Sequence, residues 1–179
     1  MRKKAAKKLH SLAGFSMAET LLAVLILLLV SSVVAAGIPS ARNAYEKTVL
    51  ASNADVLLST TISALRNELG TAQDVKVVGT TVSYFNNSAG TRSEISVNST
   101  ASPSEIMYKR FASEYANSAA VPLISRETAT GDLYVTYGSV AYDQGEGVVT
   151  FTDLSVKRTT NDTAVLATRE TLSIRVIAH

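Results

Sequence analysis

The sequence predicts an α+β protein in which a long amino-terminal helix packs on a carboxy-terminal antiparallel β-sheet. An apolar run long enough to cross a membrane begins the helix, and apolar residues at steps of three or four continue it. From residue 71 the apolar period becomes two, which is typical of half-buried strands. The 179-residue chain therefore divides into a leader (1–14), an apolar helix (15–38), an amphipathic helix (39–70) and a β-rich head (71–179).

The leader holds a cluster of positive charge and no acid. Its basic residues are Arg2, Lys3, Lys4, Lys7 and Lys8. The rest of the chain has 12 Lys and Arg against 15 Asp and Glu, so the formal charge of +2 comes from the leader alone. Such a cluster before an apolar run is retained on the cytoplasmic side of a membrane. The later basic residues are scattered among acids, so no nucleic-acid site is evident.

The apolar run extends from Phe15 to Ile38. As a helix its 24 residues would measure about 36 Å, and a hydrocarbon core is about 30 Å thick. One carboxylate, Glu19, lies just inside the run. An ionised side chain at such a depth costs roughly 3 kcal/mol or more, so this acid requires an explanation.

Two interpretations of the amino terminus compete. In one, the run is a secretory signal that is cut after Ala36, where Val34 and Ala36 provide small residues. In the other, the cut falls between Gly14 and Phe15 and the run is kept. We favour the second, because Glu19 would be a cost without benefit in a disposable signal, and because the helical pattern continues past Pro39.

The stretch "AGFSMAETLLAVLIL" resembles the prepilin signature of type IV pilins and of the pseudopilins of type II secretion and DNA-uptake machines. That signature combines a basic leader ending in Gly, a new amino-terminal Phe, a Glu at the fifth mature position and an uninterrupted apolar helix. Here these residues are Gly14, Phe15 and Glu19. The motif covers residues 1 to about 40, and the remainder is similar in architecture only.

The resemblance implies a specific chemistry at these three residues. A membrane peptidase would cut after Gly14 and methylate the new amine of Phe15. Glu19 would then pair with the positive amino terminus of a neighbouring subunit, which removes much of the penalty of a buried charge. The alternative is that Glu19 reaches back to the lipid headgroups.

The amphipathic helix is predicted from an apolar stripe and a stop signal. Gly70 is the expected stop, and Pro39 should bend or loosen the helix near residues 35–39. We expect the stripe to pack on the chain's own sheet. Its residues are Leu50, Ala54, Leu58, Ile62, Leu65 and Leu69.

Alternating apolar residues predict the strands of the head, and "NNSAG", "TGD", "DQGEG" and "TTND" predict turns between them. The inward residues are expected to be Val75, Val77, Val82, Tyr84, Ile95, Val97, Leu133, Val135, Tyr137, Val149, Phe151, Leu172, Ile174 and Val176. Between Asn98 and Ser125 the pattern is ambiguous. It allows a short helix capped by Ser102 or Ser104, or a strand from Glu105 to Phe111, and we favour the strand.

The sequence contains no recognisable catalytic arrangement. Its two histidines are His10 and His179, there is no cysteine, and no glycine-rich phosphate loop is present. Asp132, Asp143, Glu146 and Asp153 lie near predicted turns, but their spacing is not that of a calcium loop, so we interpret them as solvated turn acids. The sequence therefore predicts no enzyme, no cofactor and no metal site.

Taken with the resemblance, these features indicate a minor pilin or pseudopilin that is built into a filament. The expected partners are the prepilin peptidase, sister subunits, and indirectly an assembly ATPase and its membrane platform. The chain would cross the cytoplasmic membrane once, with its head outside the cytoplasm, before it enters a surface or periplasmic filament. The alternative is a secreted or membrane-anchored β-domain binding protein that never polymerises.

Overall fold

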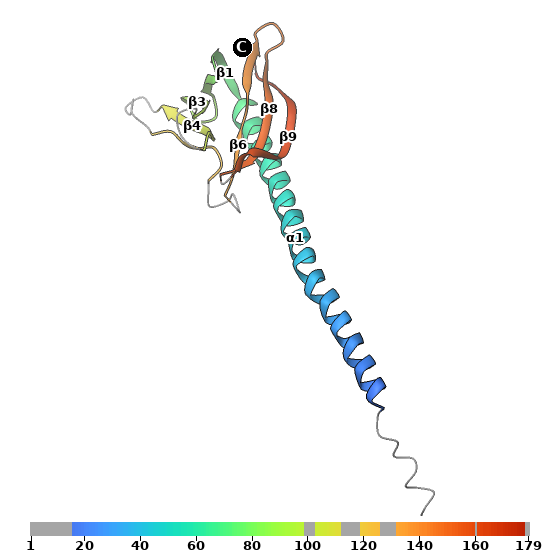
Figure 1. Cartoon of the computed structure of the whole chain (residues 1–179). Coiled ribbons are helices and arrows are strands. Elements are labelled where there is room, and N and C mark those ends of the chain that lie inside the picture. Colours follow the sequence, from blue (N-terminus) through green and yellow to red (C-terminus); the bar gives the residue numbers. More distant parts are fainter. Residues whose placement is uncertain (1–15, 99–102, 112–118, 126–131, 160, 178–179) are drawn as a thin grey trace, which may run out of the picture. The chain divides into compact units, whose positions relative to one another are not determined.

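The fold was analysed in a computed structural model of the whole chain (Figure 1). It describes residues 16–98, 103–111, 119–125, 132–159 and 161–177. Helix α1 (Met17–Leu69) comes first and is followed by strands in antiparallel sheets. The predicted α+β class, with one long amino-terminal helix on antiparallel sheets, is confirmed.

The chain forms two compact units, residues 1–47 and 48–179. Helix α1 contributes to both, and it is continuous through Pro39. It ends at the predicted stop, where the N–H of Gly70 donates to the carbonyl of Arg66 at 2.8 Å. This bond uses one of the last carbonyl groups of the helix, which have no partner within a regular helix.

In the second unit, α1 buries one face against the head. The buried residues are Ala54, Leu57, Leu58, Thr61, Leu65 and Leu69. Leu50 and Ile62 are partly buried beside them, so the predicted stripe is confirmed. Leu57 and Thr61 widen it by one row. Thr61 is tolerated there because its hydroxyl donates to the carbonyl of Leu57 at 2.8 Å.

Five strands form one antiparallel sheet in the order β1-β2-β3-β4-β5. They are β1 (Ala72–Val78), β2 (Thr81–Asn86), β3 (Thr91–Val97), β4 (Ile106–Phe111) and β5 (Val121–Pro122). Strand β4 settles the ambiguous segment as a strand. Its pairing of Tyr108 with Ile95, and of Ile95 with Val82 on β2, places the apolar faces of three strands in one row.

The remaining four strands form a second sheet around the long strand β8 (Val148–Arg158). Strands β6 (Leu133–Thr136) and β7 (Ser139–Asp143) pair with different parts of β8, and β9 (Asn161–Arg175) also pairs with it. The head therefore has two sheets. The sequence pattern predicted strands but not how they divide between two sheets. The predicted turn "DQGEG" is confirmed between β7 and β8.

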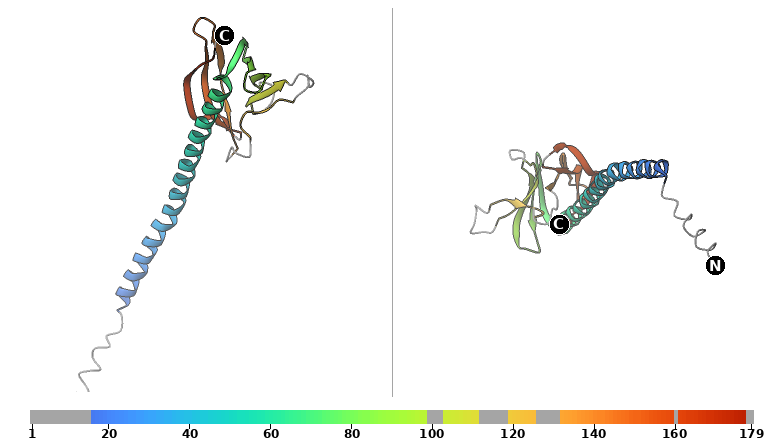
Figure 2. Two further views of the ribbon diagram at one scale, coloured as in Figure 1. Left: turned by 180° about the vertical axis from the view of Figure 1, so that it is seen from behind. Right: turned by 60° about the horizontal axis from the view of Figure 1, so that its bottom comes forward.

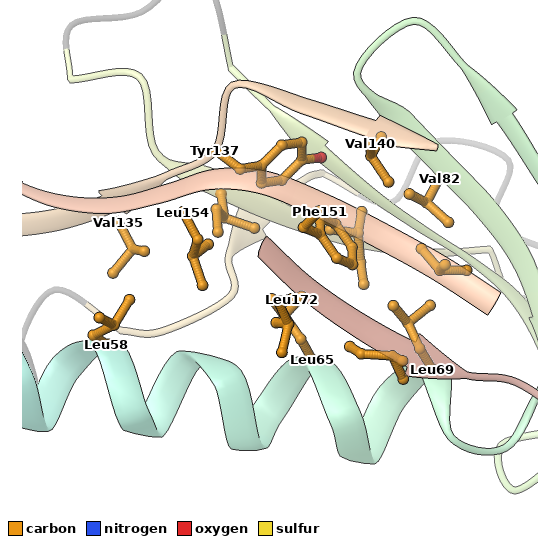
Figure 3. Close-up of a cluster of buried hydrophobic side chains, with 14 of the residues drawn as sticks. Leu58, Leu65, Leu69, Val82, Val135, Tyr137, Val140, Phe151, Leu154 and Leu172 are labelled. Carbon is orange, nitrogen blue, oxygen red and sulfur yellow. The ribbon is translucent and has the colours of Figure 1, made fainter. Parts of the chain in front are cut away.

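The core of the head lies between α1 and the sheets (Figure 3). Leu58, Leu65 and Leu69 rise from the helix toward Leu154, Phe151 and Leu172. The ring of Tyr137 packs edge-on against Phe151, with centroids 5.1 Å apart. The Tyr137 hydroxyl donates to the carbonyl of Thr80 at 2.6 Å, and this bond joins the second sheet to the β1–β2 turn.

A polar contact fixes the last turn of α1 to the five-stranded sheet. The Oε2 atom of Glu68 accepts hydrogen bonds from the hydroxyl of Tyr84 at 3.1 Å and from the side-chain amide of Asn86 at 2.9 Å. Asn86 also accepts a bond from the N–H of Ala89 at 3.1 Å. Tyr84 and Asn86 are almost fully buried, so these bonds satisfy polar groups that would otherwise be costly.

We predict that the head loses stability in alkaline solution through two tyrosines. Burial raises the pKa of both Tyr84 and Tyr137, and the nearby Glu68 carboxylate raises that of Tyr84 further. Above pH of about 10 the unfolded chain loses these protons while the folded chain keeps them, so stability falls as pH rises, by about 1.4 kcal/mol per pH unit for each tyrosine. Denaturant unfolding between pH 8 and 11 measures this slope.

Tyr137→Phe should reduce that alkaline slope by about half, because one of the two buried phenols is gone. Tyr45, which is 71% exposed, provides the matched control, and Tyr45→Phe should keep the parent slope. An unchanged slope in Tyr137→Phe would show that its hydroxyl is not sequestered from solvent.

Phe151→Ala should destabilise the head by about 3–5 kcal/mol, because Phe151 is fully buried and its ring supports Tyr137. Chemical denaturation of the full chain in detergent measures this change. Val165→Ala, at an exposed position in the same sheet, should cost less than about 0.5 kcal/mol.

Candidate functional site

The candidate site is the first turn of α1, where Ser16 caps the helix. The N–H of Ala18 donates to the Ser16 hydroxyl oxygen at 3.3 Å. The carbonyl of Ser16 accepts from the N–H groups of Glu19 and Thr20 at 2.9 and 3.1 Å. Serine is favoured in this position because its side-chain oxygen satisfies an N–H group that has no partner within the helix.

Glu19 completes the cap from the other side. Its Oε2 atom accepts a hydrogen bond from the backbone N–H of Ser16 at 2.9 Å. Together the two side chains form a capping box, the S-x-x-E pattern in which the acid three residues into the helix bonds back to the cap. A negative charge here also interacts favourably with the positive end of the helix dipole. This local role was not inferred from the sequence, although the Ser16–Glu19 spacing carries its signal.

The surroundings of Glu19 are apolar and unpartnered. Large apolar side chains are exposed on both sides of it in the sequence, at Met17 before it and at Leu21, Leu22, Val24, Leu25, Ile26, Leu27, Leu28, Leu29, Val30, Val33, Val34 and Ile38 after it. None of the most apolar part of α1 is buried within the chain, and the helix is long and apolar enough to cross a membrane. Patches of this size on soluble proteins are rare, so the surface is compatible with membrane anchoring.

Glu19 has no positive partner among the described residues. The ion pairs there join Arg42 to Glu46, and Lys76 and Arg92 to Asp74. Between Ser16 and Ala41, Glu19 is the single charged residue of the sequence. The described site thus consists of one capped but unneutralised carboxylate at the start of an exposed apolar helix.

The other predicted processing residues have different positions. Gly14 and Phe15, the expected cleavage and methylation residues, lie outside the described residues. Ala36, the cut position of the secretory alternative, lies within the continuous helix α1. Of the three residues that the motif singles out, only Glu19 therefore lies among the described residues.

The four acids that the sequence placed near turns lie in separate local settings, and the prediction was wrong for Asp153, which lies within strand β8. Asp143 accepts hydrogen bonds from the N–H groups of Gly145 and Glu146 at 2.8 and 3.2 Å. Asp132 and Asp153 adopt positive φ values of 56°, which Asp tolerates better than most residues. Over the described ranges, no three His, Asp or Glu side chains are grouped to hold a metal ion.

Comparisons with protein-family models, with curated proteins and with solved structures found no match to this chain.

Proposed function

We propose that this protein is a structural subunit of a type IV pilus-like filament, a minor pilin or pseudopilin. In this proposal it enters the cytoplasmic membrane as a precursor, with the basic leader inside and the head outside the cytoplasm. The prepilin peptidase cuts after Gly14 and methylates Phe15. An assembly ATPase and its membrane platform then drive the subunit into a filament of sister subunits.

The observation that supports this proposal most strongly is that the carboxylate of Glu19, at the start of an exposed apolar helix, has no cationic partner among the described residues. Its cap contributes about 0.5–2 kcal/mol, whereas an ionised acid within a bilayer costs roughly 3 kcal/mol or more. The cap alone therefore does not offset the cost. A cation from outside the subunit would, and a filament supplies one in the amino terminus of each incoming copy.

The geometry of the cap leaves room for such a partner. The hydrogen bond from Ser16 is to Oε2, and no described residue donates a hydrogen bond to the Oε1 atom. A carboxylate accepts at both oxygens, so capping and ion pairing are compatible on one side chain. In this proposal the cap orients Glu19 and the neighbouring amine neutralises it.

The mature amino terminus is the first test of the proposal. Edman degradation or mass spectrometry of the protein from its native membrane should give a chain that begins at Phe15 with a methylated amine. Gly14→Val should leave the leader attached, because a side chain at the cut blocks the close approach of the extended backbone. A chain that begins at Gly37 would instead support the secretory alternative and overturn the filament proposal.

The role of the Glu19 charge is the second test. Glu19→Gln keeps an oxygen that can complete the capping box but removes the charge, so it separates capping from pairing. We expect Glu19→Gln and Glu19→Ala to be cleaved normally and to enter filaments at least about tenfold less than the parent, because a lost ion pair of 1.4 kcal/mol or more has that effect. Immunoblots of sheared filament and membrane fractions measure incorporation.

Ser16→Ala is the matched control, because it removes a cap contact and keeps the charge. Its incorporation should stay within about fivefold of the parent, since a weakened cap costs about 1 kcal/mol or less. If Glu19→Gln assembles like the parent while Glu19→Ala and Ser16→Ala fail together, Glu19 acts as a cap and the pairing hypothesis is wrong.

A further inference from the structure

A hollow of about 340 Å³ opens in the head where the two sheets meet. Strand β1 is an edge of the five-stranded sheet and lies beside the four-stranded sheet, with β7 as its neighbour (Figures 1 and 2). Sites for small molecules measure about 300–1,000 Å³, so a small ligand fits here. A second hollow, between α1 and β6, measures about 20 Å³ and holds about one water molecule.

A β-bulge forms the wall of the larger hollow on β1. The ladder between β1 and β2 is interrupted between Gln73 and Lys76, so Asp74 and Val75 together take the place of one ladder residue. Val75 turns into the core and is 8% exposed, whereas Asp74 has a positive φ of 48° and stays at the surface. Bulges redirect side chains and are frequent beside functional sites. Gln73 and Asp74 both border the hollow.

The end of β7 and the turn that follows it form the opposite wall. Tyr142 is half-buried there, and Gln144 is exposed in the turn. The carboxylate of Asp143 fixes this turn, because it accepts two hydrogen bonds from backbone N–H groups within it. The bond from the Tyr137 hydroxyl to the β1–β2 turn joins the same two sheets, so both walls belong to one packed unit.

The charge at the hollow is already balanced. Asp74 forms ion pairs with Arg92, and with Lys76 at 3.5 Å. The hydrogen bond from Arg92 lowers the pKa of Asp74, so at neutral pH its carboxylate is ionised and only accepts hydrogen bonds. Among the described residues, none that lines the hollow is a lysine or arginine, and no acids are grouped there to hold a metal ion. The hollow therefore suits neither a phosphate nor a metal ion.

The other lining side chains suit a neutral ligand with several hydroxyl groups. The amides of Gln73 and Gln144 each donate and accept hydrogen bonds, and the hydroxyl of Tyr142 does both. Val176 and Ile177 lie beside these groups, and Ile177 is 45% exposed. A wholly apolar ligand would leave the amides without partners, which is costly.

We propose that this hollow is a saccharide-binding site on the head. The hydroxyl groups of a sugar ring bond to the amides of Gln73 and Gln144, and the Asp74 carboxylate accepts from a further hydroxyl. The C–H groups of the ring pack on Ile177. This function goes beyond filament assembly and does not depend on Glu19.

Saturation-transfer difference NMR of the full-length protein in phosphatidylcholine nanodiscs tests the proposal. Sugar-based detergents are avoided, because their headgroups would compete for the site. The probes are glucose, galactose, mannose, N-acetylglucosamine and N-acetylgalactosamine. One or more of them should bind with a dissociation constant of about 1 mM, since a small ligand with few contacts gains little beyond the cost of its immobilisation.

Gln73→Ala and Gln144→Ala should each weaken sugar binding by about two- to tenfold, because each removes hydrogen bonds from one wall. Neither side chain belongs to the buried core, so both variants should keep the thermal unfolding transition of the parent. Asn67→Ala is the matched control. It removes an exposed amide of α1 that does not line the hollow, and it should bind sugar like the parent.

Three results would overturn the proposal. One is that none of the five sugars binds, and another is that binding is unchanged when Gln73→Ala and Gln144→Ala are combined. The third is displacement of the bound sugar by inorganic phosphate, which would indicate an anion site elsewhere. Since assembly into filaments is measured separately with the Glu19 variants, failure of either proposal leaves the other standing.

Discussion

The contact on which the head depends is the burial of one face of α1 against the two sheets. Leu58, Leu65 and Leu69 supply the helix side of the core, and each is almost completely removed from solvent. Burying a leucine contributes about 1.5–3 kcal/mol, so these three outweigh any single polar contact in the head. The hydrogen bonds from Tyr84 and Asn86 to Glu68 fix the position of the end of α1 over strand β2. Without the apolar face of α1, the apolar side chains that both sheets turn toward the helix would be exposed to water.

One helix presents two kinds of surface because its sequence changes along its length. From Leu21 to Ile38 it carries no charged residue and is exposed on every side, which suits a hydrocarbon environment. From Thr48 onward, polar residues return to the outer face and the apolar ones narrow to a stripe. Arg42 and Glu46 pair at 2.9 Å between these parts, which is typical of a helix surface in water. The change of pattern, and not a break in the helix, separates the two surfaces.

Much of the fold could be predicted from local pattern, because the helix stripe and most strands repeat at their own periods. Strand β7 was missed, since Val140 and Tyr142 alone alternate with Ser139, Ala141 and Asp143. The division into two sheets depends on the pairing of β8 with three strands, which no local pattern encodes. Glu68 could not be matched with Tyr84 and Asn86, because these partners meet only after the sheet has formed. At the candidate site, the unusual position of the Glu19 charge could be recognised from the sequence. The hydrogen bond that Glu19 accepts from Ser16 was not predicted.

Stability and the proposed function depend on different residues of this chain. No side chain between Met17 and Ile38 is buried, whereas the whole apolar core belongs to residues from Ala54 onward. Changes at Ser16 or Glu19 should therefore leave the unfolding of the head unaltered, because distant sites without shared contacts act independently. A defect in assembly from a Glu19 variant with a normally folded head would then report the charge itself. That separation makes one carboxylate in an apolar helix a tractable target, since its effects cannot be confused with loss of the fold.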